Sequence, residues 1–166
     1  MNSPFGNLFT AVQERIKERV TAIVHIDQDM GQLKNELRPT VSWPCVLIDF
    51  DAFRFECLAE NVQVANGIVA LTLGFKPSSN TTQLTPGTYV QSALEYYDIE
   101  WQLQQALEGW SPGEGYGALV RMTATTQKSK GAFRVREIRY SIAFEDYSTR
   151  LGANYVAALG KVVAEV

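Results

Sequence analysis

The chain has 166 residues, of which 46% are hydrophobic and 20% are charged, and its formal net charge is −3. This composition is typical of a folded globular protein and excludes a disordered chain. The acidic balance argues against a nucleic-acid binder, because such proteins carry a basic surplus. No apolar run is long enough to cross a membrane, so no membrane partner is expected. The length predicts a single domain over residues 1–166, with 150–166 as a candidate C-terminal extension.

The first predicted element is an amphipathic helix over residues 4–20. The Ser3-Pro4 pair supplies an N-cap and a first helical residue. Six apolar residues then recur at helical spacing: Phe5, Leu8, Phe9, Val12, Ile16 and Val20. A short strand is expected at 22–26, and a polar connection over 27–44 leads to a strand at 45–51.

The pair Asn66-Gly67 lies between two runs of alternating apolar residues, which is the strongest short-range signal for a β-hairpin. It predicts a hairpin over about 58–75 with a two-residue turn, in which Val64 lies opposite Val69. Nearly all side chains on that face of the hairpin are apolar, so we expect a helix to cover it.

A second helix is expected over about 88–110. Its main apolar stripe consists of Tyr96, Ile99, Leu103, Ala106, Leu107 and Trp110. A second apolar stripe is turned well away from the first: Val90, Leu94, Tyr97 and Trp101. One interpretation is a wide core contact, covered in part by the C-terminal tail. The other is a subunit interface, where aromatic residues are favoured.

A second hairpin is expected over about 119–144. Alternation places three residues of its first strand on one face: Val120, Met122 and Ala124. The polar tip between its strands carries Lys128 and Lys130. Such a tip is usually a solvated loop, but in an oligomer these two lysines are candidates for reaching into a neighbour or lining a channel.

Together the elements predict an α+β fold with a mostly antiparallel sheet. The sheet consists of two hairpins, at about 58–75 and 119–144, plus the strand 45–51. The helices at about 4–20 and 88–110 are expected on one face of the sheet, because that arrangement buries both sets of apolar side chains.

Paired carboxylates are the main candidates for chemistry. Asp27 and Asp29, like Asp49 and Asp51, are spaced so that each pair points the same way from a strand, and four carboxylates can ligate a divalent cation. Asp27 and Asp29 together with Glu56 also suggest a metal-dependent nuclease, but the lysine expected two residues after Glu56 is absent. Runs of acids are more often solvated. A small metal-dependent enzyme is therefore kept as an alternative, and no catalytic residue, metal or cofactor is predicted.

Neither histidine nor cysteine offers a stronger signal. His25 is the only histidine and has no nucleophile near it in sequence, so a structural role is favoured. Cys45 and Cys57 lie in or beside predicted strands and are expected to be free thiols, as in a reducing cytosol.

The order of elements and five segments resemble the phage tail terminator and tail completion (head–tail joining, neck) proteins. The segments are Lys17–Val20, Trp43–Asp49, Gly67–Leu73, Leu94–Trp110 and Tyr140–Asp146. The resemblance spans roughly residues 5–146 and rests on a pattern of elements rather than on a sharp motif. Members of that family are small α+β proteins that close the head-proximal end of a tail tube, typically as rings of six.

The resemblance implies a structural assembly protein, not an enzyme, that is made in the bacterial cytoplasm and built into a phage or prophage tail. It would cap the tail tube or join tail to head as a ring, possibly a hexamer. The implied partners are further copies of the chain, the tail tube protein and a head-completion or connector protein, with DNA passing through the ring without specific binding. A cytosolic protein-binding module is the remaining alternative.

Overall fold

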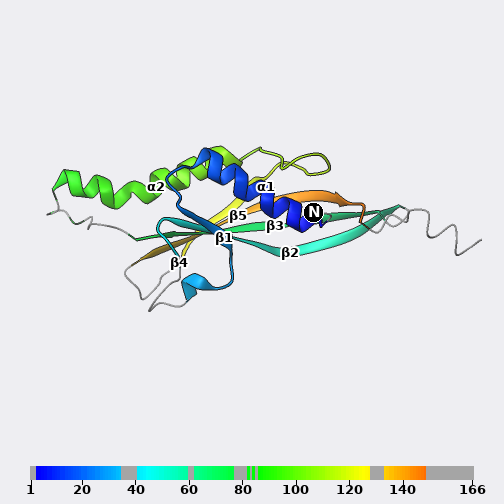
Figure 1. Cartoon of the computed structure of the whole chain (residues 1–166), viewed down its shortest axis with the longest axis horizontal. Coiled ribbons are helices and arrows are strands. Elements are labelled where there is room, and N and C mark those ends of the chain that lie inside the picture. Colours follow the sequence, from blue (N-terminus) through cyan, green and yellow to red (C-terminus); the bar gives the residue numbers. More distant parts are fainter. Residues whose placement is uncertain are drawn as a thin grey trace, which may run out of the picture.

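The structure is a computed structural model that describes residues 3–34, 41–59, 62–76, 82, 84, 86–127 and 133–148. As predicted, the fold is α+β with a mostly antiparallel sheet, and its five strands lie in the order β1-β2-β3-β5-β4 (Figure 1). The elements are α1 (Pro4–Arg19), β1 (His25–Gln28), the 3₁₀ helix η1 (Gln32–Lys34), β2 (Cys45–Ala59), β3 (Val62–Phe75), α2 (Gly87–Leu107), β4 (Val120–Gln127) and β5 (Arg134–Asp146). Only the short β1 pairs in parallel, with the start of β2.

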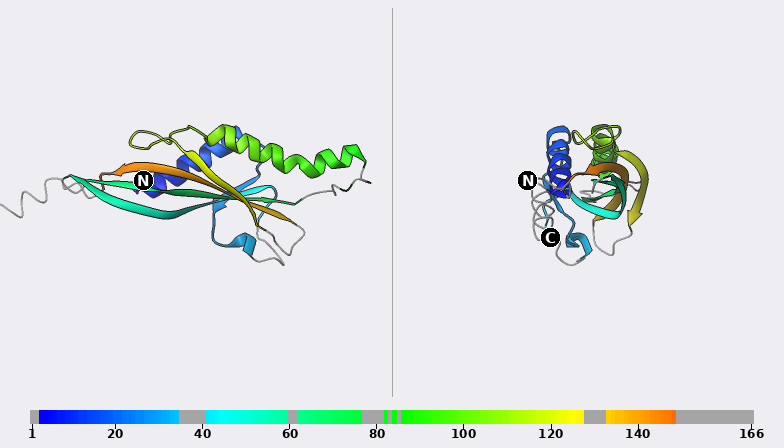
Figure 2. Two further views of the ribbon diagram at one scale, coloured as in Figure 1. Left: turned by 180° about the vertical axis from the view of Figure 1, so that it is seen from behind. Right: turned by 90° about the vertical axis from the view of Figure 1, so that its right-hand side faces the viewer.

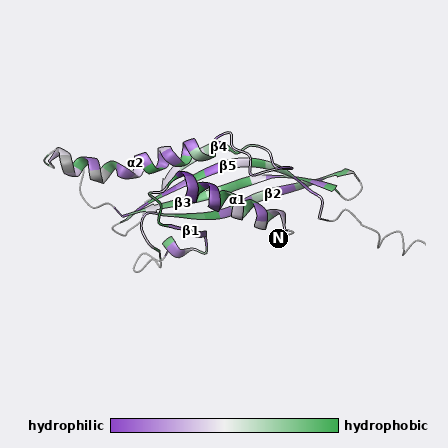
Figure 3. Ribbon diagram, turned by 45° about the horizontal axis from the view of Figure 1, so that its top comes forward, coloured by the Kyte–Doolittle hydropathy of each residue, from purple (hydrophilic) through white to green (hydrophobic). Residues whose placement is uncertain are grey.

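Both long helices cover the same face of the sheet, as predicted, and they lie side by side (Figure 2, right). Their apolar stripes meet alternate residues of β2, β3 and β5 in one core, which includes Leu8, Val12, Ile16, Ile99, Leu103, Ile48, Leu71, Leu73, Ile138 and Tyr140. The hydropathy colours of Figure 3 follow this arrangement, with hydrophobic stretches along the sheet and mixed helices. Each helix buries one stripe, because alternate strand residues present an apolar surface only toward the helices.

The predicted turn at Asn66-Gly67 is wrong, although β2 and β3 do form a hairpin. Strand β3 runs straight through both residues, and the connection between β2 and β3 falls at residues 60–61. Glycine is required at position 67 because the ring of Phe53 lies against it: an added Cβ would lie 2.3 Å from that ring. The residue therefore permits close packing rather than a turn.

Strand β4 also departs from the predicted alternation. Val120 is 50% exposed and Met122 is 60% exposed, while Ala124 does pack against the core. The register against β5 shifts between Arg121 and Thr123. This bulge adds a residue to one strand and so changes which side chains face the helices.

Several element boundaries differ from the sequence prediction, and the strand predicted at 45–51 continues to Ala59 and is itself the first strand of the hairpin. Helix α2 ends at Leu107 instead of residue 110, and Gly109 then takes a φ of 71°, which turns the chain back toward the sheet. Trp110 lies beyond the helix but still packs on the core, where the Arg15 guanidinium is 5.4 Å from the centre of its ring. Strand β1 begins at His25, later than the predicted 22–26.

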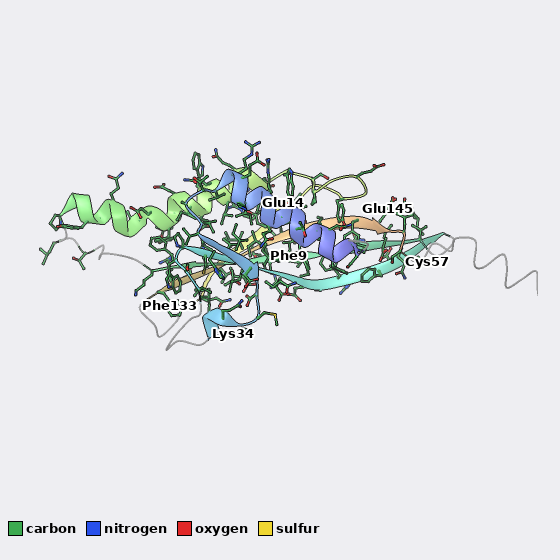
Figure 4. All side chains as sticks on the ribbon, viewed as in Figure 1. Phe9, Glu14, Lys34, Cys57, Phe133 and Glu145 are labelled. Atoms are coloured by element: carbon green, nitrogen blue, oxygen red, sulfur yellow. The ribbon has the colours of Figure 1, made fainter. Side chains whose placement is uncertain are left out.

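The connection after β1 forms a second, smaller core on the other face of the sheet. It contains Leu33, Cys45, Leu47 and Val135, with Val41, Trp43 and Phe133 packed against them. In Figure 4 Lys34 and Phe133 lie on the side of the sheet away from the helices. Within the described part of the chain, this connection covers one end of that face and the rest of the face is open.

Candidate assembly interface

One flank of α2 is tied to β5 and β4 by polar contacts. From its middle toward its C-terminal end, Glu100 forms an ion pair of 2.9 Å with Arg136, and Gln104 accepts a 3.0 Å hydrogen bond from the Tyr140 hydroxyl. One turn further on, the Glu108 carboxylate accepts a 2.9 Å hydrogen bond from the backbone N–H of Arg121 at the start of β4. These contacts fix which side of α2 is turned toward the β4 edge of the sheet.

The second apolar stripe lies next to these contacts, on the side of α2 turned away from the buried stripe. Leu94 is 38% exposed, Tyr97 is 50% exposed and Trp101 is 60% exposed, while Val90 is half-buried. All four follow the helical spacing that leads to Gln104. Figures 1 and 2 show that the amino-terminal part of α2 extends beyond the end of the sheet. The predicted interface residues are thus brought together on one surface.

An aromatic and cationic cluster holds the outer part of α2 in place. The Arg134 guanidinium lies 4.2 Å from the ring centre of Tyr96 and 5.7 Å from that of Tyr97. The two tyrosine rings are 3.9 Å apart. The pKa of the Tyr96 phenol is raised to about 12, mainly because the side chain is buried, so the phenol is neutral at physiological pH. The stripe is therefore presented on an anchored helix.

Beside the stripe, β4 forms an unprotected edge of the sheet. Its residues Thr123–Gln127 pair with β5 on one side and have no strand on the other. Among the described residues, no side chain donates to or accepts from their backbone groups. Three of the five are threonine, which is well suited to a strand. Such an edge is a template for another strand, and the sequence patterns did not indicate it.

The opposite edge of the sheet is protected where β1 forms it. Gln13 donates a 3.0 Å hydrogen bond to the Ile26 carbonyl, and the Asp27 carboxylate accepts the N–H of Gln28 at 2.8 Å. Further along, β2 becomes the edge, and Asp49 accepts the N–H of Phe50 at 2.8 Å. These side chains occupy backbone groups that a neighbouring strand would otherwise use.

Protection of the β2 edge ends after a bulge. The register shifts between Asp51 and Arg54, and Ala52 has a φ of 53°. Residues Arg54–Leu58 then continue the strand, and in the described part of the chain nothing pairs with their outer side. Phe55 is 43% exposed and Leu58 is 61% exposed. This second apolar edge also escaped the sequence prediction, because the hairpin turn was placed elsewhere.

The predicted acidic residues have other partners. Asp29, Asp49 and Asp51 line one hollow of about 420 Å³ on the open face of the sheet, whereas Asp27 does not. Asp29 accepts hydrogen bonds from the Gly31 N–H at 2.9 Å and the Thr72 hydroxyl at 3.0 Å, and Asp51 pairs with Arg139. Within the described residues, no group of three or more histidines, cysteines or acids is placed to hold a metal ion.

The remaining candidates do not form a site either. The His25 imidazole lies 4.0 Å from the Asp27 carboxylate. Cys45 and Cys57 are free thiols, and burial raises the pKa of Cys45 to about 11. Lys128 and Lys130 lie outside the described residues. No helix in the described ranges is both long and apolar enough to span a membrane.

Comparison with known proteins shows a likeness of fold. No protein-family model and no curated protein sequence matches the chain. Its fold is similar to that of a chain from the virion of native gene transfer agent (GTA) particle, with a TM-score of 0.51 over 87% of this chain and 99% of that chain. The two sequences are 11% identical, so the likeness is one of fold.

Proposed function

We propose that this protein is a structural subunit of a phage or prophage particle that acts at the end of the tail tube or at the head–tail joint. Its fold is similar to that of a chain in a gene transfer agent particle, and the order of its elements resembles tail terminator proteins. The observation that carries the proposal is the anchored, exposed stripe of Leu94, Tyr97 and Trp101, because large aromatic side chains held rigidly in solvent favour protein contacts.

The proposed mechanism is capping by a ring. Copies of the chain associate head to tail, so that one surface of each meets a different surface of the next and the ring closes. The ring binds the last layer of tail tube protein and offers its other side to a head-completion protein. The Lys128 and Lys130 tip is proposed to reach a neighbour or the channel.

The open face of the sheet suits the wall of such a channel. Its hollow has four carboxylates, from Asp29, Asp49, Asp51 and Glu137, against the cations of Lys34 and Arg139. A surplus of negative charge repels the phosphate backbone, so DNA passes without binding. The metal-dependent alternative is not favoured, because these carboxylates already bond to backbone, hydroxyl and guanidinium groups.

Mixing the purified chain with the tail tube protein encoded beside it tests the proposal. We expect negative-stain images to show an extra ring at one end of each tube, and tube growth from that end to stop. A matched sample of bovine serum albumin controls for crowding. Tubes that keep growing and carry no ring in the presence of excess chain would contradict the proposal, and so would a gene neighbourhood without capsid or tail genes.

A further inference from the structure

The middle of α2 is tied to the sheet next to the open edge of β4. Glu100 is ion-paired with Arg136, and Arg136 lies opposite Thr126 of β4. A strand added outside β4 would lie about 4.8 Å from it, one strand further out than β4 from this point of attachment.

We propose that the added strand is Arg54–Leu58 of a second copy of this chain, pairing with Thr123–Gln127. The inference rests on the self-assembly in the proposed function and names the two surfaces that meet. The segments are of equal length, and both have outer backbone groups without a partner among the described residues. The edges at β1 and at Phe50 are instead protected by Gln13, Asp27 and Asp49.

Strand direction agrees with this pairing. Strands β2 and β5 both run antiparallel to β3, and β4 runs antiparallel to β5. In a head-to-tail assembly each copy keeps the same direction, so the β2 of one copy meets the β4 of its neighbour antiparallel. That geometry gives the perpendicular hydrogen bonds of an antiparallel ladder.

The side chains also match face by face. Phe55 lies opposite the buried Ala65, so Phe55 and Cys57 face the helix side of the sheet. Ala124 lies opposite the buried Ile138, so Ala124 and Thr126 face the same side. In the pairing, the exposed ring of Phe55 is placed beneath the neighbour's α2. The β4 segment has no charged residue, so the charges of Arg54 and Glu56 meet no like charge on it.

The pairing joins two different surfaces, so it generates a ring or a helical array and not a two-fold dimer. Thr125 lies in the same cross-strand row as Leu47 of β2. Glu56 lies opposite Val64, in a row further along β2 toward its carboxyl end. Successive copies are thus shifted along the strands. The contact covers the ring of Phe55, which is 43% exposed in the single chain.

Disulfide cross-linking tests the pairing, because Cys57 is a natural exposed thiol on the proposed β2 segment; it lies near the end of the sheet in Figure 4. Ala124→Cys and Thr126→Cys place a second thiol on the same face of β4, and Thr125→Cys places one on the opposite face. After mild oxidation we expect at least one same-face variant to give covalent multimers at tenfold or greater yield than Thr125→Cys. Adding Cys57→Ser should abolish them.

Sedimentation of each variant before oxidation separates this inference from the proposed function. Assembled protein that gives equal multimer yields from Thr125→Cys and Thr126→Cys, or none from the same-face variants, would overturn the pairing and leave self-assembly intact. Protein that stays monomeric at all concentrations would overturn both. Multimers that persist with Cys57→Ser would show a symmetric β4–β4 contact and would also overturn the pairing.

Discussion

The ring of Phe53 packs against the backbone of Gly67 across the β2–β3 pair, so closely that a Cβ at position 67 would lie 2.3 Å from it. Ala52 and Phe53 lie in the bulge between Asp51 and Arg54, and Ala52 has a positive φ. The bulge turns the ring inward, and there it joins Phe5 and Phe144 at centroid distances of 4.9 and 5.8 Å. Glycine, bulge and aromatic cluster thus form one packing unit beneath the start of α1.

Gly67→Ala is therefore expected to destabilise the protein by about 1–3 kcal/mol, because the added Cβ overlaps the ring of Phe53 and forces a shift in the aromatic cluster. Urea unfolding followed by circular dichroism measures the change. Gly87→Ala is the matched control, since a Cβ there meets nothing within 4 Å. Equal stabilities of the two variants would show that Phe53 moves away without cost.

Loss of the Glu100 charge should weaken the attachment of α2. Glu100 is only 9% exposed and its carboxylate pairs with Arg136 at 2.9 Å. Glu100→Gln leaves a largely buried guanidinium without its counter-charge, which costs about 2–4 kcal/mol. Calorimetry gives the melting temperature of this variant and of Glu95→Gln, an exposed control on the same helix. An unchanged melting temperature for Glu100→Gln would contradict a structural role for the pair.

The contact between Glu108 and β4 gives a pH dependence. The Arg121 N–H and, less strongly, the Gln104 amide lower the pKa of the Glu108 carboxyl below its ordinary 4.5. A lowered pKa in the folded state stabilises the fold above the ordinary value, and this contribution disappears as the pH falls through the folded pKa. Between pH 6 and pH 3, Glu108→Gln is expected to lose less stability than the wild-type chain. A parallel loss in both would count against the contact.

The two thiols should differ in reactivity. Cys45 is fully buried and its pKa is raised to about 11, chiefly by burial, whereas Cys57 is exposed. A maleimide reagent at pH 7.5 is expected to modify one thiol per folded chain, at Cys57, and both thiols in urea. Mass spectrometry of the labelled peptides checks the assignment. Rapid labelling of Cys45 in the folded protein would mean that the smaller core opens readily.

The helices and the class of fold were predictable because their signals are local. The stripe that begins at Leu8 repeats every three or four residues, and the one around Leu103 does the same. The turn was not predictable, because Asn66-Gly67 has the sequence of a hairpin turn while the packing of Phe53 decides the outcome. The bulge at Met122 was not predictable for the same reason, because strand register depends on partners that are distant in the sequence.

The candidate site was predictable only in part. Helical periodicity predicts the stripe containing Tyr97 and Trp101, but it does not predict where the sheet places that stripe. The open edges Thr123–Gln127 and Arg54–Leu58 depend on the strand order, and no local pattern encodes that order. The carboxylates of Asp27 and Asp49 suggested metal binding by their spacing, yet each bonds to the backbone N–H of the next residue.

The most direct test of assembly through the exposed flank of α2 is the molar mass of Trp101→Glu by light scattering coupled to size exclusion. Gln102→Glu adds the same charge to α2 outside the exposed stripe, about 100° around the helix from Trp101, and serves as the control. We expect Trp101→Glu to have wild-type circular dichroism and the mass of a monomer, while the control and the wild-type chain form multimers. A multimer of wild-type mass from Trp101→Glu would contradict the account.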